Sequence, residues 1–320
     1  MRCLITGGAG FLGSALANHL AQEGHDVRVV DDLSNGDRSF LSPTVHFNRG
    51  DINNIPFLWS MLQDVDCVFH LAARVSVAQS ILYPLDYNRV NVGGTVSLME
   101  AMRDAGVSRV VLASSGAIYG EQTRQPVRET DDPRPDSPYA VSKWAAEQYV
   151  HTIGRLWGIE TVAVRIFNAY GPRQALPVSH APVVPRFLRQ VLSGGSVVLF
   201  GNGQQTRDFI FVSDVVTALV CAAEADADVV NRQVINIGSG EETSVDALVG
   251  LVEEATARPA NRVYNRDKSG GVDRLVADIA RARRLLNWTP TVSLHEGLAR
   301  TVAVDERFRT ATAQVLEPQF

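Results

Sequence analysis

The stretch that decides the fold is Thr6-Gly7-Gly8-Ala9-Gly10-Phe11-Leu12-Gly13, close to the amino terminus. An apolar run at 2–6 precedes it, and apolar residues recur at helical spacing over 11–21, which predicts a strand, a glycine turn and a helix. Gly7 permits a tight turn, Gly10 lets the backbone approach a phosphate, and Gly13 lets the helix pack closely on the strand. The unpaired amides at the start of the helix then face the phosphate. The spacing is G-x-x-G-x-x-G rather than the standard G-x-G-x-x-G, so this motif alone also fits an ordinary strand-to-helix turn.

An acidic residue after the second predicted strand strengthens the nucleotide interpretation. The strand spans 27–30 and ends in Asp31. A carboxylate at this place binds the ribose hydroxyls of a dinucleotide and repels a 2′-phosphate. The sequence therefore favours NAD over NADP as the cofactor.

Two more predicted strands, at 45–49 and 67–71, end in residues that suit the same cofactor. Asp51 follows the first and can contact the adenine amine, while the small Ala72 and Ala73 let a cofactor lie across the end of the second. Strands that alternate with helices predict an α/β fold with a doubly wound, Rossmann-like parallel sheet. Its ligand is expected at the carboxyl ends of the strands.

A tyrosine and a lysine one helical turn apart predict proton-transfer chemistry. The serine–proline pair at 137–138 suits the start of a helix, so Tyr139 and Lys143 lie on one face of it. A tyrosine pKa is about 10, and lowering it takes about 1.4 kcal/mol per unit. A nearby ammonium and a positively charged nicotinamide both favour the phenolate. Upstream, a strand at 109–113 leads to Ser115, whose hydroxyl can bond to a substrate oxygen; the alternative is an exposed tyrosine–lysine pair with no chemistry.

Together these motifs resemble the extended short-chain dehydrogenase/reductases, in the nucleotide-sugar epimerase/dehydratase branch typified by UDP-glucose 4-epimerase. The resemblance runs from residue 1 to about 307 and is carried by TGGAGFLG at 6–13, DDLSNG at 31–36, GDI at 50–52, HLAA at 70–73, NVGGT at 91–95, SSGAIYG at 114–120, SPYAVSK at 137–143, RIFNAYGPRQ at 165–174, RDFIFVSDV at 207–215 and NIGSG at 236–240. It implies that Ser115, Tyr139 and Lys143 are the catalytic triad and that Asn91 supports the site. The cofactor residues that it implies are Gly7, Gly10, Phe11, Leu12, Gly13, Asp31, Asp32, Ser34, Asn35, Gly36, Asp51, Ile52, Leu71, Ala72, Ala73, Asn91, Tyr139 and Lys143.

The second half of the chain is expected to bind the substrate. The resemblance implies an NAD-binding domain at 1–167 and a smaller α+β nucleotide-sugar domain at 168–320, with the chain crossing between them. The substrate-binding residues that it implies are Ser115, Asn168, Phe200, Arg207, Lys268 and Arg274. Guanidinium groups suit a diphosphate because they bind it bidentately. Lys268 stands where the family usually has an arginine, and Leu275 stands where some members have a tyrosine, which leaves room for an N-acetyl group.

The reaction expected from the resemblance is 4-epimerisation of a UDP-hexose through a transient 4-keto sugar. A dehydratase usually has an aspartate–glutamate pair where this chain has Gly116 and Ala117, and a UDP-glucuronate decarboxylase typically has a glutamate at 117. Alternatives are a UDP-glucuronate 4-epimerase or decarboxylase, a net NAD-dependent sugar oxidoreductase, and an NAD-sensing scaffold. In a uronate enzyme, Arg74 or Arg173 would meet the carboxylate.

Composition excludes several other classes of function. Hydrophobic residues make up 45% of the chain and the net charge is −5, with no basic stretch, so nucleic-acid binding is not expected. No apolar run approaches the roughly 20 residues of a membrane span, and the first strand follows Met1 without room for a signal peptide. The three cysteines have no metal-ligand spacing, which indicates core thiols, no metal and a cytoplasmic protein.

The resemblance implies a homodimer formed by long helices at 82–105 and 138–154.

Overall fold

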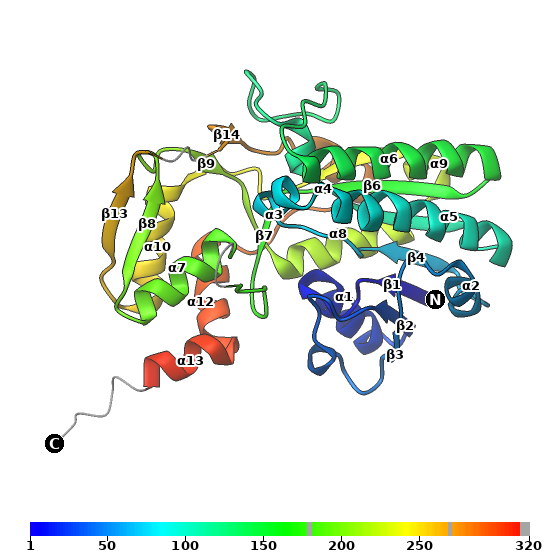
Figure 1. Ribbon diagram of the computed structural model, residues 1–320, viewed down its shortest axis with the longest axis horizontal. Helices are drawn as coiled ribbons and strands as arrows, with labels where there is room; N and C mark the ends of the chain where they lie inside the picture. The colour runs from blue at the N-terminus through cyan, green and yellow to red at the C-terminus, as the bar shows by residue number, and fades with distance from the viewer. Residues whose placement is uncertain (178–180, 268–270, 314–320) are drawn as a thin grey trace.

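Seven parallel strands form the larger sheet of the computed structural model, which describes residues 1–177, 181–267 and 271–313. The strand order is β11-β6-β5-β4-β1-β2-β3 (Figure 1). The strands are β1 (Arg2–Thr6), β2 (Asp26–Asp31), β3 (His46–Arg49), β4 (Cys67–His70), β5 (Arg109–Ser115), β6 (Glu160–Ile166) and β11 (Gln233–Ile237). Chain order reverses between β1 and β4, and the crevice at the carboxyl ends of these strands is the expected ligand site.

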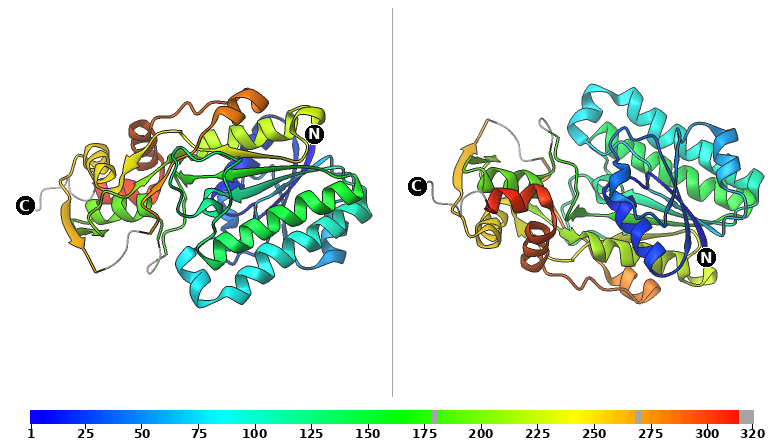
Figure 2. Two further views of the ribbon diagram at one scale, coloured as in Figure 1. Left: turned by 90° about the horizontal axis from the view of Figure 1, so that it is seen from above. Right: turned by 90° about the horizontal axis from the view of Figure 1, so that it is seen from below.

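Helices cover both faces of this sheet, as the alternating pattern predicted. On one face, α1 (Phe11–Gln22) lies beside α8 (Val212–Glu224), and both pack onto a large apolar core. On the other, α2 (Ile55–Met61), α5 (Gly94–Ala105) and α6 (Pro138–Trp157) enclose a second apolar cluster (Figure 2). Burial on both faces explains why the central strands are almost entirely apolar.

The helix predicted over 82–105 is not continuous. It is divided into α3 (Val77–Leu82), α4 (Pro84–Tyr87), a π-helical turn at Asn88–Gly93, and α5. Pro84 has no amide hydrogen with which to continue the preceding helix. Asn91, which is predicted to support the site, lies in this π turn with its side chain buried.

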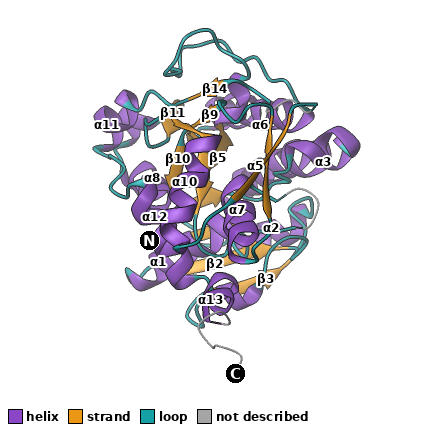
Figure 3. Ribbon diagram, turned by 90° about the vertical axis from the view of Figure 1, so that its left-hand side faces the viewer, coloured by secondary structure: helices purple, strands orange, loops and turns teal. Residues whose placement is uncertain are grey.

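A second, smaller body lies at the carboxyl ends of the large sheet (Figures 1 and 3). Its strands pair as β7 (Asn168–Tyr170) with β10 (Phe209–Phe211), β8 (Ser196–Phe200) with β13 (Asn261–Asn265), and β9 (Thr206–Arg207) with β12 (Thr243–Ser244) and β14 (Arg274–Leu275). Its helices are α7 (Val183–Leu192), α10 (Val245–Thr256), α12 (Leu294–Val304) and α13 (Glu306–Ala313).

The chain crosses between the two bodies more than once. It enters the smaller body at β7, returns to the large sheet through α8, α9 (Ala227–Val230) and β11, and leaves again at β12. Later, α11 (Ala280–Leu286) contacts β11 and α8. The predicted division of the chain into domains at 1–167 and 168–320 stays a prediction. Among the described helices, none is long and apolar enough to cross a bilayer.

Candidate active site

The glycine turn between β1 and α1 is built by two close approaches of the backbone. Gly7 has φ +69°, and a Cβ there would lie 2.7 Å from the Ala72 backbone at the end of β4. A Cβ on Gly13 would overlap the carbonyl oxygen of Gly7. The missing side chain of Gly13 therefore allows the helix to lie close to the glycine turn rather than to the strand. A larger residue at Gly7 or at Gly13 would force the turn apart.

The start of α1 presents unpaired amides to a cavity. Gly10 is the N-cap residue, no side chain caps the helix, and its first turn contains no acidic residue. Gly10 through Gly13 line a cavity of about 410 Å³. This cradle fits the pyrophosphate of a dinucleotide, because the helix dipole and the free N–H groups both favour an anion.

Asp31 is held at the end of β2 by two amides. Its carboxylate accepts hydrogen bonds from the backbone N–H groups of Ala9, at 3.0 Å, and Leu33, at 2.8 Å. Burial raises the pKa of Asp31, and these two bonds oppose the rise. The carboxylate lines the cavity and also ties the loop after β2 to the glycine turn.

Almost all residues predicted to bind the cofactor line this one cavity. They are Gly7, Gly10, Phe11, Leu12, Gly13, Asp31, Asp32, Ser34, Asn35, Gly36, Asp51, Ile52, Leu71, Ala72, Ala73, Tyr139 and Lys143. The exception is Asn91, which lies behind the lining. Its amide group accepts a hydrogen bond from Arg74 N at 2.7 Å and donates to Arg74 O and Ser142 Oγ. Asn91 therefore joins the loop after β4 to α6.

Ser115, Tyr139 and Lys143 meet in the same cavity as the glycine turn. Ser115 ends β5, while the other two residues come from the first turns of α6, whose N-cap Ser137 accepts a hydrogen bond from Ala140 N at 3.3 Å. Burial raises the pKa of Tyr139, and a hydrogen bond with the Ser115 hydroxyl opposes this. Burial lowers the pKa of Lys143 to about 8. The ammonium therefore stays largely protonated at neutral pH and can stabilise a phenolate.

Glu147 is a member of this region that sequence reasoning missed. It lies one helical turn beyond Lys143, is fully buried, and opposes the lowering of the Lys143 pKa. Its carboxylate accepts hydrogen bonds from Ser114 Oγ at 2.8 Å and from Arg165 Nη2 and Nε at 2.6 and 3.1 Å. The only feature of the sequence that could have indicated Glu147 is its position four residues after Lys143. Lysine–glutamate pairs at this spacing are common on helix surfaces, so the feature is not specific.

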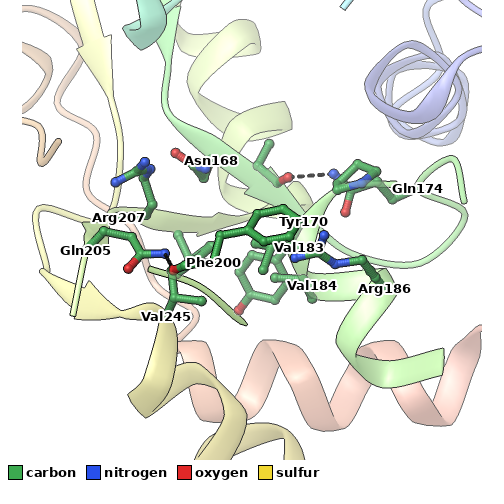
Figure 4. A pocket seen from close by; sticks show the side chains of 13 residues that line it. Asn168, Tyr170, Gln174, Val183, Val184, Arg186, Phe200, Gln205, Arg207 and Val245 are labelled. Atoms are coloured by element: carbon green, nitrogen blue, oxygen red, sulfur yellow. Dashed lines mark hydrogen bonds between the residues drawn. The ribbon is translucent and has the colours of Figure 1, made fainter. Parts of the chain in front are cut away.

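A second cavity of about 300 Å³ adjoins the first and contains part of the predicted substrate site (Figure 4). The two cavities share Ala169, Gln174 and Pro182 in their linings. Asn168 and Arg207 line the second one, together with Phe200. These three come from β7, β9 and β8, so the smaller body brings them together from distant parts of the chain.

The structure does not bring all predicted substrate residues to this cavity. Arg274 lines neither cavity, because its guanidinium makes two hydrogen bonds of 2.6 Å to Glu242. Leu275 is buried against Tyr119 and Phe167, so it is part of the apolar core rather than of either cavity wall. Lys268 lies outside the described residues.

The two arginines considered for a uronate carboxylate are placed differently. Arg74 lines the first cavity, as Ser115, Tyr139 and Lys143 do. Arg173 donates to the Phe40 carbonyl oxygen at 2.9 Å and lines neither cavity.

A doubly wound sheet with a serine, a tyrosine and a lysine beside a dinucleotide cradle defines a short-chain dehydrogenase/reductase. Residues 3–238 match the NAD dependent epimerase/dehydratase family, and the chain belongs to that family. It is 39% identical to a UDP-glucose 4-epimerase of Mycolicibacterium smegmatis, over 94% of this chain and 97% of that protein.

Solved structures support the same assignment. The crystal structure of a UDP-glucose 4-epimerase with UDP-glucose from Thermotoga maritima is similar with a TM-score of 0.91 and 37% identity, covering 99% of this chain and 100% of that one. A UDP-N-acetylglucosamine 4-epimerase from Methanobrevibacter ruminantium, in complex with UDP-N-acetylmuramic acid, has a TM-score of 0.89 and 32% identity, covering 94% and 97%. These similarities support NAD-dependent UDP-sugar 4-epimerase activity and leave several sugars open.

Proposed function

We propose that this protein is an NAD-dependent 4-epimerase of a UDP-hexose of the glucose/galactose type, N-acetylated or not. The observation that carries the proposal is the meeting of Ser115, Tyr139 and Lys143 in the cavity that the glycine turn lines. The adjoining cavity, with Asn168 and Arg207, supports a nucleotide diphosphate as the part of the substrate that is held.

The roles of the three residues follow from their positions. Tyr139 takes the proton from the sugar 4-hydroxyl, and the Ser115 hydroxyl bonds to the same oxygen and orients it. The Lys143 ammonium stabilises the phenolate. Bound NAD⁺ supplies the hydride acceptor and, once reduced, the donor that returns the hydride.

Return of the hydride to the opposite face of the 4-keto sugar needs no further acid or base. After the sugar has turned, Tyr139 gives its proton back to the oxygen. Gly116 and Ala117 follow Ser115 directly and have no side chain that could remove water from the sugar. These features favour epimerisation over elimination, and cofactor that is regenerated in each turnover is expected to stay bound.

Incubation with UDP-sugars tests the proposal directly. Purified protein without added cofactor is expected to convert UDP-glucose to its 4-epimer, because the bound NAD is regenerated. UDP-galactose, UDP-N-acetylglucosamine and UDP-glucuronate are run in parallel, and NMR resolves the products. Turnover that needs stoichiometric NAD(H) would contradict the proposal and indicate a net oxidoreductase. Conversion of UDP-glucuronate alone would identify the uronate enzyme instead, with Arg74 as the carboxylate partner.

A homodimer is the proposed assembly, and an exposed apolar face supports it. Val77, Ile81 and Leu82 on α3, Leu85 on α4 and Tyr149 on α6 are 45 to 77% exposed. If this face joins two copies, Ile81→Glu is expected to shift the protein to a monomer in sedimentation velocity. Val304→Glu, on an apolar residue of α12 that is 61% exposed, should leave the sedimentation coefficient unchanged. A wild-type monomer, or an I81E protein that sediments as the wild type does, would rule this interface out.

A cytoplasmic location stays a prediction. The three cysteines are free; Cys3 and Cys67 are buried and Cys221 is partly buried. Burial raises the pKa of all three thiols, as expected for unreactive core cysteines.

A further inference from the structure

His70, at the end of β4, is a buried titratable residue to which the proposed mechanism assigns no role. It is 2% exposed, and both of its ring nitrogens have partners. Nδ1 lies 2.7 Å from Thr6 Oγ1, and Nε2 lies 2.8 Å from Thr95 Oγ1. Thr6 directly precedes the glycine turn, and Thr95 lies in the first turn of α5. The ring therefore bridges the strand that leads into the cofactor cradle and the helix that follows the π turn.

The partners of the two threonines determine where the protons of this bridge lie. The Thr95 hydroxyl donates its one proton to the Asn91 carbonyl oxygen at 2.6 Å, so Nε2 of His70 must be the donor to the Thr95 oxygen. A neutral imidazole carries one N–H, so Nδ1 accepts the proton of the Thr6 hydroxyl. The Thr6 oxygen in turn accepts from Ala72 N at 3.3 Å. One neutral tautomer, with its proton on Nε2, therefore satisfies every group of the bridge.

The surroundings of His70 disfavour its charged form. Burial and the Lys143 ammonium lower the pKa of His70 to about 3. A second ring proton, on Nδ1, would also point at Thr6 Oγ1, whose own proton would then lose its acceptor. The ring therefore acts as a fixed donor and a fixed acceptor at neutral pH, and not as an acid or a base.

From Thr95 the hydrogen bonds continue to the helix of Tyr139. Asn91, whose carbonyl oxygen is held by Thr95, donates from Nδ2 to Ser142 Oγ at 2.9 Å. The Ser142 hydroxyl donates to the Tyr139 carbonyl oxygen at 2.8 Å. Thr6, Thr95, Asn91 and Ser142 are each at most 4% exposed, and a buried polar network that is fully satisfied is rigid. The series therefore fixes the first turn of α6, and with it the phenol, relative to the glycine turn.

We propose that His70 is a positioning residue of the reaction, which sets the distance between the cofactor cradle and Tyr139 as a neutral imidazole with its proton on Nε2. This inference rests on the proposed function, because the hydride leaves C4 and the proton leaves the 4-hydroxyl of the same sugar, and both acceptors must be in place together. The two bonds of the ring have separate tasks. The bond from Thr6 supports the cradle, and the bond to Thr95 supports the π turn and α6.

The variants His70→Asn and His70→Gln separate the two bonds, because the amide of asparagine takes the place of Nδ1 and the amide of glutamine takes that of Nε2. H70N keeps an acceptor for Thr6 and loses the donor to Thr95. We expect it to retain wild-type NAD content and KM but to lower kcat about 10- to 100-fold, since a displacement of about 1 Å can lower a rate about 10²-fold.

H70Q has the opposite defect, since it keeps the donor to Thr95 and loses the acceptor for Thr6. It should purify with less NAD, because the loss of a buried hydrogen bond at the cradle is expected to weaken NAD binding about 10-fold. Added NAD should restore its kcat to the wild-type value. The measurements are the NAD content after purification and the kcat and KM for the UDP-sugar, with and without added NAD.

Two further variants serve as a second test and as a control. Thr95→Val removes the hydroxyl and keeps the shape of the side chain, so T95V should lower kcat as H70N does. His151→Asn is the matched control, since His151 is a half-buried histidine of α6 that lines neither cavity and bonds through Nδ1 to Thr161 Oγ1 at 2.9 Å. H151N should keep wild-type kcat and NAD content.

Nitrogen NMR of the wild-type His70 ring provides a measurement that does not depend on turnover. The proton should stay on Nε2 from about pH 5 to about pH 8, the range in which an ordinary histidine titrates. A proton on Nδ1, or titration within that range, would overturn the inference, as would wild-type kcat in both H70N and T95V. Equal loss of NAD from H70N and H70Q would also overturn it, because the two bonds would then have no separate tasks. Failure of the wild-type protein to convert any UDP-sugar would overturn the proposed function as well, whereas the wrong tautomer with normal turnover would overturn this inference alone.

Discussion

Replacement of Tyr139 by phenylalanine is expected to reduce turnover of the UDP-sugar by about 10²- to 10⁴-fold, the usual contribution of a positioned acid–base group. The phenol oxygen is the atom that exchanges a proton with the sugar 4-hydroxyl, and phenylalanine keeps the ring without that oxygen. Tyr139 also packs edge-on against Tyr87, with ring centres 6.4 Å apart, and this contact survives in the variant. The measurement is kcat in an assay that follows the 4-epimer by NMR.

Retention of the cofactor shows whether the variant loses activity because a catalytic group is missing or because the structure is damaged. Y139F should purify with as much NAD as the wild-type protein, because the glycine turn and Asp31 are untouched. Tyr149→Phe is the matched control, since Tyr149 lies on the same helix and is 46% exposed. A Y139F protein that keeps more than about a tenth of wild-type kcat would contradict the catalytic role. A loss of less than about 10-fold lies below the range for acid–base groups. Full activity of Y139F in a chain that still binds NAD would indicate a different base.

Replacement of Glu147 by alanine is expected to destabilise the protein by about 3–5 kcal/mol, the typical result of breaking a buried ion pair from one side. The carboxylate is fully buried, and its partner Arg165 is 4% exposed. Removal of Glu147 leaves that guanidinium without its anion, beside the Tyr119 ring, whose centre is 4.7 Å from the guanidinium carbon. It also releases the Ser114 hydroxyl, next to Ser115, which we propose to be catalytic.

Thermal unfolding of E147A measures this effect as a lower midpoint, by several degrees for a chain of this size. The control is Glu242→Ala, which breaks an ion pair of similar geometry with Arg274, whose side chain is 55% exposed. Exposed pairs contribute little, so E242A should unfold close to the wild-type midpoint. Equal midpoints for E147A and the wild-type protein would show that the buried pair does not stabilise the fold. In a folded E147A protein, loss of the fixed anion should also lower the pKa of Lys143, so activity should fall at a lower pH on the alkaline side.

Features that depend on short stretches of chain were predictable. The glycine turn, the carboxylate after β2 and the tyrosine–lysine pair each depend on spacings of a few residues, and local backbone geometry then places the side chains. Alternation of apolar strands with helices likewise predicted the doubly wound sheet. The helix over 82–105 was predicted wrongly as continuous, because its apolar spacing persists through the π turn that places Asn91.

Features that depend on contacts between distant segments were not predictable. Arg274 carries the same guanidinium as Arg207, but in the fold this group is bound by Glu242, the residue just before β12. Leu275 is likewise buried in a core cluster rather than in a cavity wall.

The sequence by itself determined the fold class and the cofactor, and it predicted the chemistry at Tyr139, because those depend on local spacing and on residue type. Only the tertiary structure decided which charged side chains remain available to a ligand. Glu147 and Arg165 are separated by 18 residues and neutralise each other, while Arg186, in the second cavity, has no carboxylate partner among the residues that the structure describes. The physical reason is that the pairing of a buried charge depends on which elements pack beside it, and that information is spread over the whole chain.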